Sequence, residues 1–316
     1  MKKILFAVFA LAALASCTNN EVIELNQQAI AFGDVFVDNA TRADYSGNRD
    51  IQSFKVYGTV TGSEQNPVKI FNGATVSRPD GLATGTYKDE MAWNCDVIQY
   101  WVSNAAYKFA AIVDATSIAC DTETHLLPET INFTVTDGDG DLLYAEEVAE
   151  TDENATPNVS MVAFTFNHLL SKVQFNITNS IGAGYSIKVT GISVGGALDK
   201  GVYTVDGGTW AKATDAAKLA TPLSFGTTDV LANGASAVAS HTCQILPLEQ
   251  KLDITITYEI YYGGQLLSTN TKTGSVNKPF AKDTVYSINA AITGSKIQFT
   301  VSSVAGFTYS GDITLE

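Results

Sequence analysis

The sequence is poor in cysteine, in positive charge and in long apolar runs. It contains four cysteines in 316 residues, and 33 acidic residues outnumber 19 lysines and arginines, for a formal charge of −14. Proteins that bind nucleic acid need a basic face, so this balance excludes nucleic acid as a partner. The apolar run Ile4–Leu14 is shorter than the about 20 residues that cross a bilayer. Helical periodicity is also nearly absent, which favours strands throughout.

The N-terminal residues have the pattern of a secretory signal peptide. Lys2 and Lys3 precede the apolar run, and Leu14-Ala-Ser-Cys17 follows it, so Cys17 stands directly after a small-residue cleavage site. This pattern matches a bacterial lipobox, in which Cys17 is acylated and becomes the first mature residue. An ordinary signal peptide with an incidental cysteine is the alternative.

The lipobox interpretation predicts where the mature protein resides. Two or three acyl chains hold a protein durably on a membrane. Thr18-Asn19 stands where an inner-membrane retention signal would carry Asp. We therefore expect a signal peptide at residues 1–16, a tether at 17–28, and an outer-membrane lipoprotein at the cell surface.

The other three cysteines do not form a disulfide framework. Cys95, Cys120 and Cys243 are an odd number, so one thiol must remain unpaired. A bridge between Cys95 and Cys120 and buried free thiols both remain open.

Alternation of apolar and polar residues predicts an all-β fold. It is clearest at Ile51–Tyr57, Ile131–Val135, Val173–Ile177 and Ile254–Tyr258. Clusters of Gly, Asn, Asp and Ser separate these runs, and Gly263-Gly264 predicts a tight hairpin. Such strands favour antiparallel sandwiches. The length favours two domains, which we place at residues 29–167 and 168–316.

Two motifs suggest chemistry but lack the context it needs. Gly191-Ile-Ser193-Val-Gly195 fits a nucleophile elbow, yet no helical period follows it, so a serine near a strand end explains Ser193 better. Asp137-Gly-Asp-Gly-Asp141 resembles half of a calcium loop, but it lacks the required Gly at position six and Glu at position twelve. A turn between strands is the preferred interpretation, with a weak surface Ca²⁺ site as the alternative.

The histidines give no sign of a metal site. His125, His168 and His241 are far apart in sequence, and zinc needs three or four converging ligands. The sequence therefore predicts no metal, no cofactor and no enzyme, with His168 as a structural hydrogen-bonding residue. A secreted hydrolase is disfavoured for the same reason.

Aromatic residues leave one functional alternative open. Trp93, Trp101 and Trp210 could stack on sugars if they were exposed, which would make the chain a surface glycan-binding lipoprotein. The alternation in Tyr107-Lys-Phe109 favours core packing for this region.

Several segments occur in a characteristic order and spacing. They are Ile30-Ala-Phe32 with Ala40-Thr-Arg-Ala43, Phe54–Tyr57, the block Trp93–Ala111, Asp141–Ala145, Val162–Phe175, Ile245–Leu248 and Pro279–Tyr286. Together they resemble the fimbrillin family, the lipoprotein-derived pilins of Gram-negative anaerobes. Leu248 stands where many relatives have Gln, and Phe307 where a tryptophan is frequent. These departures leave the role of the subunit as shaft, tip or anchor unassigned.

The resemblance implies two transthyretin-like β-sandwich domains and head-to-tail assembly by donor strands. It implies cleavage by an arginine-specific protease between Arg42 and Ala43, with Arg49 as the alternative site. The expected partners are other fimbrial subunits, the outer membrane through the lipid on Cys17, and a host or bacterial receptor for adhesion. The segment removed would include an apolar strand with Ile30, Phe32, Val35 and Val37.

The C-terminal tail supplies the expected donor strand. Residues 296–301 alternate cleanly and are expected to pair within their own domain. The apolar residues that follow would be an aggregation hazard if exposed. We therefore expect residues 305–316 to enter the groove of the next subunit through Phe307, Tyr309, Ile313 and Leu315.

Overall fold

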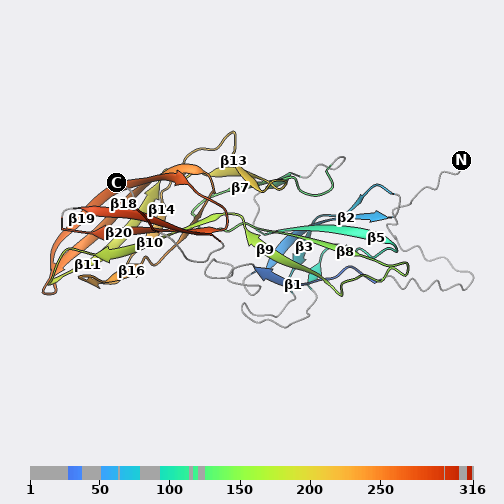
Figure 1. The fold of residues 1–316 in the computed structure, drawn as a ribbon, viewed down its shortest axis with the longest axis horizontal. Helices are drawn as coiled ribbons and strands as arrows, with labels where there is room; N and C mark the ends of the chain where they lie inside the picture. Colours follow the sequence, from blue (N-terminus) through green and yellow to red (C-terminus); the bar gives the residue numbers. More distant parts are fainter. Residues whose placement is uncertain are drawn as a thin grey trace, which may run out of the picture.

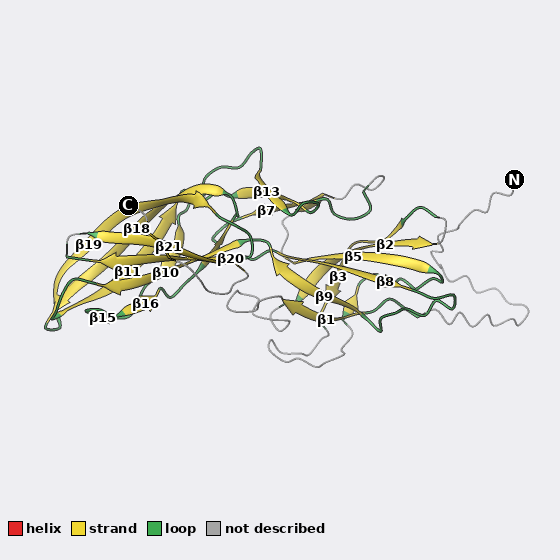
Figure 2. Ribbon diagram, viewed as in Figure 1, coloured by secondary structure: helices red, strands yellow, loops and turns green. Residues whose placement is uncertain are grey.

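The computed structural model describes residues 28–37, 51–62, 65–78, 93–113, 117–119, 125–294, 296–305 and 312–314. All regular structure within these ranges is β-strand, arranged in several sheets (Figures 1 and 2), which confirms the all-β prediction. No helix long and apolar enough to cross a membrane occurs in these ranges.

A seven-stranded sheet contains most of the strands from the first half of the chain. In spatial order they are β1 (Phe32–Val37), β9 (Val162–His168), β8 (Leu143–Glu150), β5 (Ala105–Val113), β2 (Ser53–Gly62), β3 (Val68–Ser77) and β4 (Asn94–Cys95). β1 therefore forms one edge of this sheet, next to β9.

Two further sheets face each other in the second half of the chain. One contains β16 (Ser236–Val238), β10 (Ser171–Asn179), β20 (Thr284–Ile292), β21 (Ile297–Ala305) and β22 (Asp312–Thr314), with β17 (Cys243–Ile245) beside β10. The other contains β14 (Leu223–Gly226), β11 (Tyr185–Gly195), β18 (Glu249–Tyr262) and β19 (Gln265–Pro279), with β15 (Leu231–Ala232) beside β11. The rings of Phe175 and Phe225 meet across the two sheets, 4.8 Å between centroids.

A four-stranded sheet joins the two halves of the sequence. Its order is β13 (Thr209–Lys212), β12 (Lys200–Thr204), β7 (Thr130–Thr134) and β6 (Ser117–Ala119). β7 lies before the predicted domain boundary at residues 167/168, whereas its partner β12 lies after it. Hydrogen bonds between strands thus cross that boundary, which itself stays a prediction.

The burial pattern explains why these segments are strands. In β18 every second residue from Gln250 to Tyr258 is buried, as expected for a sheet with one face on a core. The Gly263-Gly264 hairpin joins β18 to β19, and both glycines have positive φ, which suits them to this tight turn.

Two strand pairs are parallel, although the sequence favours antiparallel sheets. They are β1 with β9 and β10 with β20. A parallel pair needs a long crossover between its strands, and more than 100 residues separate the members of each pair. The local alternation that predicts a strand carries no information about the direction of its partner.

The buried apolar residues form two separate clusters. The first half of the chain contributes one cluster around Phe32, Phe109 and Phe164. The other spans the second half and includes β7 and one face of β5 and β8, for example at Ile112 and Tyr144. Figure 1 shows the corresponding groups of strands at opposite ends of an elongated molecule.

Candidate functional site

The β1 segment lies in a groove whose two walls are backbone. On one side β1 pairs in parallel with β9. On the other side the amide of Ile30 donates to the carbonyl of Gln99 over 2.8 Å, and the amide of Trp93 donates to the carbonyl of Phe32 over 2.7 Å. Trp101 likewise donates its amide to the carbonyl of Gln28 over 3.1 Å. The groove therefore binds the main chain of an extended segment on both sides.

The apolar side chains of this segment fill the first-half core. Four of the eight residues predicted for strand exchange lie in this segment and are buried: Ile30, Phe32, Val35 and Val37. The ring of Phe32 lies within 5.4–6.5 Å, between centroids, of four phenylalanines: Phe54, Phe71, Phe109 and Phe164. Aromatic pairs at such distances add to the stabilisation from burial alone. β1 is thus part of the core, as expected of a core-filling strand.

The tail lies partly in the described region. Residues 297–305 form β21, which pairs with β20 in its own sheet. Ile313 belongs to β22, whose backbone pairs with β21 opposite Val301. Phe307, Tyr309 and Leu315 lie outside the described residues, as do Cys17, Arg42 and Ala43. The lipid and cleavage sites therefore stay predictions.

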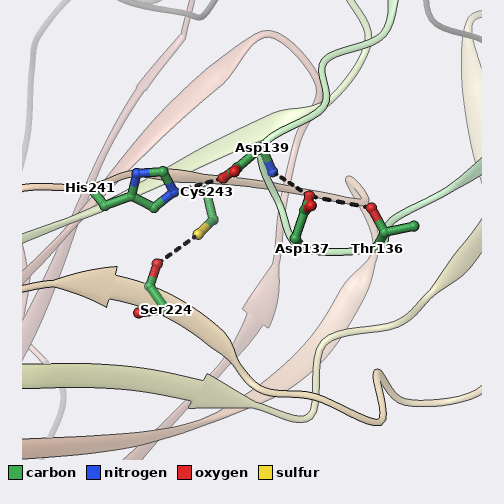
Figure 3. A network of polar contacts seen from close by, with 6 residues as sticks. All are labelled: Thr136, Asp137, Asp139, Ser224, His241 and Cys243. Atoms are coloured by element: carbon green, nitrogen blue, oxygen red, sulfur yellow. Dashed lines mark hydrogen bonds and ion pairs between the residues drawn. The ribbon is translucent and has the colours of Figure 1, made fainter.

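The aspartate-rich loop of residues 137–141 forms a turn tied to histidines. The side chain of Asp137 accepts a hydrogen bond from the amide of Asp139 over 3.0 Å, and Asp139 Oδ1 lies 2.7 Å from Nε2 of His241 (Figure 3). No group of three or more His, Cys, Asp or Glu side chains in the described part of the chain is arranged to hold a metal ion. The loop thus connects strands and contacts β17, where Gln244 donates its amide to the carbonyl of Gly138.

The third aspartate of this loop makes a buried pair. Asp141 Oδ2 lies 2.6 Å from Nδ1 of His168, and both side chains are 1% exposed. Asp141 Oδ1 also accepts the amide of Leu142 over 2.8 Å. His168 is therefore a structural hydrogen-bonding residue, as the sequence predicts.

The other potentially nucleophilic side chains, Ser193, Cys243 and Cys95, lie within strands. Ser193 lies within β11, paired on both sides with Thr255 and Ser224. Cys243 is buried and donates to the carbonyl of Ser224 over 3.4 Å (Figure 3). Cys95 is a free thiol, and burial raises its pKa, which favours the unreactive protonated form.

The tryptophans do not form a stacking platform for sugars. Trp101 is fully buried against Tyr107, with 4.6 Å between ring centroids. Trp210 donates its indole N–H to the carbonyl of Leu169 over 2.8 Å, and Trp93 packs on Phe54. A cleft of about 560 Å³ next to β2, β5 and β8 contains Thr59, Lys108 and Glu146, and none of the described residues that line it has a phenyl or indole ring.

Sequence reasoning did not identify the second wall of the groove. The segment Trp93–Trp101 was predicted as aromatic core, and it does supply Trp101 to the core. Its backbone contacts with residues 28–32 have no local signal, because they join segments about 60–70 residues apart. The structure adds that Val97, Ile98, Tyr100 and Val102 in and beside this segment are exposed, which the sequence did not indicate.

Comparison with known proteins identifies the family. The family model described as fimbrillin-like matches residues 41–306. No curated protein matches the sequence. Among solved structures, a candidate cell adhesion protein from Bacteroides ovatus is 13% identical with a TM-score of 0.55, and the match covers 90% of this chain and 99% of that one.

Two further structures align over similar lengths. A candidate cell adhesion protein from Bacteroides uniformis is 16% identical, with a TM-score of 0.47 and coverage of 90% and 98%. The fimbrial anchor protein Mfa2 from Porphyromonas gingivalis is 12% identical, with a TM-score of 0.36 and coverage of 88% and 97%. The Bacteroides ovatus structure supports the overall fold, and the family match covers most of the sequence. The chain therefore belongs to the fimbrillin-like family.

Proposed function

We propose that this chain is a non-enzymatic structural or accessory subunit of a surface fimbria that serves adhesion. It consists of two transthyretin-like sandwich domains, residues 29–167 and 168–316. Its subunits join when β1 leaves its groove and the C-terminal tail of a neighbouring subunit takes its place. The observation that carries this proposal is the position of β1: a six-residue strand at a sheet edge that nevertheless fills a core.

The burial of β1 makes the groove dependent on an occupant. Burying one large apolar side chain contributes about 1.5–3 kcal/mol, so four of them contribute about 6–12 kcal/mol. This is comparable to the about 5–15 kcal/mol that stabilises a whole domain. A subunit that lost β1 would therefore need another strand in the groove.

The geometry of the groove supports replacement by a strand of another subunit. An open edge with free amide and carbonyl groups is a template for strand addition, and alternate side chains enter its pockets. The donor and acceptor surfaces lie on different parts of one chain, so the contact is heterologous and builds an open filament. The apolar residues of the tail of one subunit and the open groove of the next would each cover the other.

Export and maturation come before assembly in this proposal. The precursor is acylated at Cys17, and an arginine-specific protease then cleaves after Arg42 at the surface. We expect N-terminal sequencing of surface-recovered protein to give Ala43, and labelling of the precursor by a palmitate analogue to disappear in Cys17→Ala. Surface material that begins at Cys17 would show that this subunit keeps β1.

Deletion of residues 305–316 tests the assembly mechanism. We expect the truncated precursor, which still holds β1, to stay folded, soluble and lipidated. It should form no filaments in electron micrographs, because no tail is available to replace β1 in the groove of a neighbour. In the described part of the tail, Ala305 pairs with β20 and the three residues of β22 pair with β21. These few pairs lie at the end of the sheet, so the loss of stability should be small.

Two outcomes would contradict this expectation. Filaments of normal length from the truncated chain would place the donor strand elsewhere. An unfolded truncated chain would make the tail part of its own core. The glycan-binding alternative predicts that the full-length protein binds polysaccharide in a pull-down without forming filaments, but the burial of Trp101 weighs against it.

A further inference from the structure

We infer that the donor tail enters the β1 groove in the same chain direction as β1 and with a defined register. This inference rests on the proposed strand exchange and adds its polarity. The tail residues take the places of the β1 residues in order: Phe307 for Ile30, Tyr309 for Phe32, Ile313 for Val35, and Leu315 for Val37.

The β1 segment defines what the groove accepts. It runs parallel to β9, with Phe32 opposite Val162 and Val37 opposite Phe166. The register shifts between Gly33 and Val35, so one extra residue interrupts the alternation. The buried positions consequently come as two pairs, 30 with 32 and 35 with 37, separated by a short irregular stretch.

The tail has the same arrangement of two apolar pairs. Residues 307 and 309 form the first pair and residues 313 and 315 the second. Gly311-Asp312 precedes the second pair of the tail as Gly33-Asp34 precedes the second pair of β1. The tail has one more residue between its pairs, and a glycine there gives the backbone the freedom to accommodate it.

Side-chain volume distinguishes the two directions of entry. The Phe32 site is surrounded by the rings of Phe54, Phe71, Phe109 and Phe164, whereas Val35 occupies a site with no solvent exposure. Entry in the β1 direction places an aromatic ring in the first site and a β-branched side chain in the second. Reversed entry would place Tyr309 in the valine site and Ile313 among the rings. It would overpack one site and leave a cavity in the other.

The tail is long enough for this role. β21 ends at Ala305, and residues 306–316 follow it. Eleven extended residues span at most about 36–40 Å. The four apolar residues from Phe307 to Leu315 use nearly all of this length. Few residues therefore remain on either side to allow another register.

Disulfide trapping tests the direction directly. Thr165 is exposed and lies opposite Phe36, the residue between Val35 and Val37. In the inferred direction Thr314 of the donor takes this position, whereas in the reversed direction Thr308 takes it. Neighbouring strands lie about 4.7–4.9 Å apart, within the Cα separations that a disulfide bridges.

The two directions thus have matched variants, Thr314→Cys/Thr165→Cys and Thr308→Cys/Thr165→Cys. Both are made with Cys95→Ser and Cys120→Ser and recovered as surface filaments. After oxidation we expect a ladder of linked subunits on a non-reducing gel from the first variant and not from the second. A ladder from the Thr308 variant would overturn the inferred direction and leave strand exchange intact.

A composition-matched swap gives an independent measurement. Tyr309→Ile/Ile313→Tyr keeps the same side chains but exchanges their order, and we expect it to reduce filament yield at least tenfold. Unchanged yield, or filaments in which neither cysteine pair forms a ladder, would overturn the inference. If the unsubstituted chain forms no filaments, the proposed function itself fails.

Discussion

Phe32→Ala should lower the free energy of unfolding of the first-half core in the precursor by about 3–5 kcal/mol. Phe32 is 1% exposed, and its removal leaves a cavity between rings that belong to four other strands. Because the four rings come from four different strands, the inward movement of one strand cannot fill this space. Urea denaturation followed by tryptophan fluorescence measures the effect, since Trp93 and Trp101 lie beside this core.

Ile98→Ala is the matched control for this measurement. Ile98 lies in the wall segment of the same groove but is 68% exposed, so we expect a change within about 0.5 kcal/mol. A loss below about 1 kcal/mol for Phe32→Ala would show that β1 is dispensable to the precursor. The need for a replacement strand after cleavage would then disappear as well.

Asp141→Ala should cost about 3–5 kcal/mol of stability, because it leaves the buried His168 without its carboxylate partner. It also removes the acceptor of the Leu142 amide. Leu142 and Leu143 belong to different apolar clusters, as do Phe166 and Leu169. The Asp141–His168 pair therefore links two of the connections at which the chain passes between the cores. Urea denaturation of the full chain at neutral pH should show the loss.

Asp139→Ala is the control that separates the effect of burial on stability from the effect of an aspartate–histidine pair as such. Asp139 lies in the same loop and contacts His241 over 2.7 Å, but the two side chains are 60% and 45% exposed. Exposed pairs contribute about 0–1 kcal/mol, so this variant should remain close to the unsubstituted protein. Equal losses from both variants would mean that the conformation of the loop, and not the buried pair, is responsible.

The strands and their buried faces follow closely from the sequence. The alternation at Ile254–Tyr258 predicted a strand with one buried face, and β18 has this pattern. The Gly263-Gly264 turn was predicted where β18 meets β19. The apolar residues of β1 also indicated a buried strand, although an extra residue between Gly33 and Val35 interrupts their alternation. These features depend on period and turn chemistry, which neighbouring residues determine.

The wall of the groove beyond β1 could not be predicted in this way. The contact between Ile30 and Gln99 is a backbone hydrogen bond, and every residue except proline carries the same donor and acceptor. No side-chain pattern therefore marks the partner. The Asp141–His168 contact had a weaker signal, because both residue types suggested hydrogen bonding without indicating each other.

By itself the sequence determined the all-β character of the chain, the positions of most strands and the likeness to fimbrillins. Each of these depends on alternation, on turn residues or on the order of segments, which can be read from the residues along the chain. Only the tertiary structure decided that β1 and β9 are parallel, that β7 pairs with β12, and that Phe32 lies among four rings. These contacts join segments about 20 to 130 residues apart. The choice among such partners depends on the packing of the whole core, which is a property of the folded chain and of no single segment.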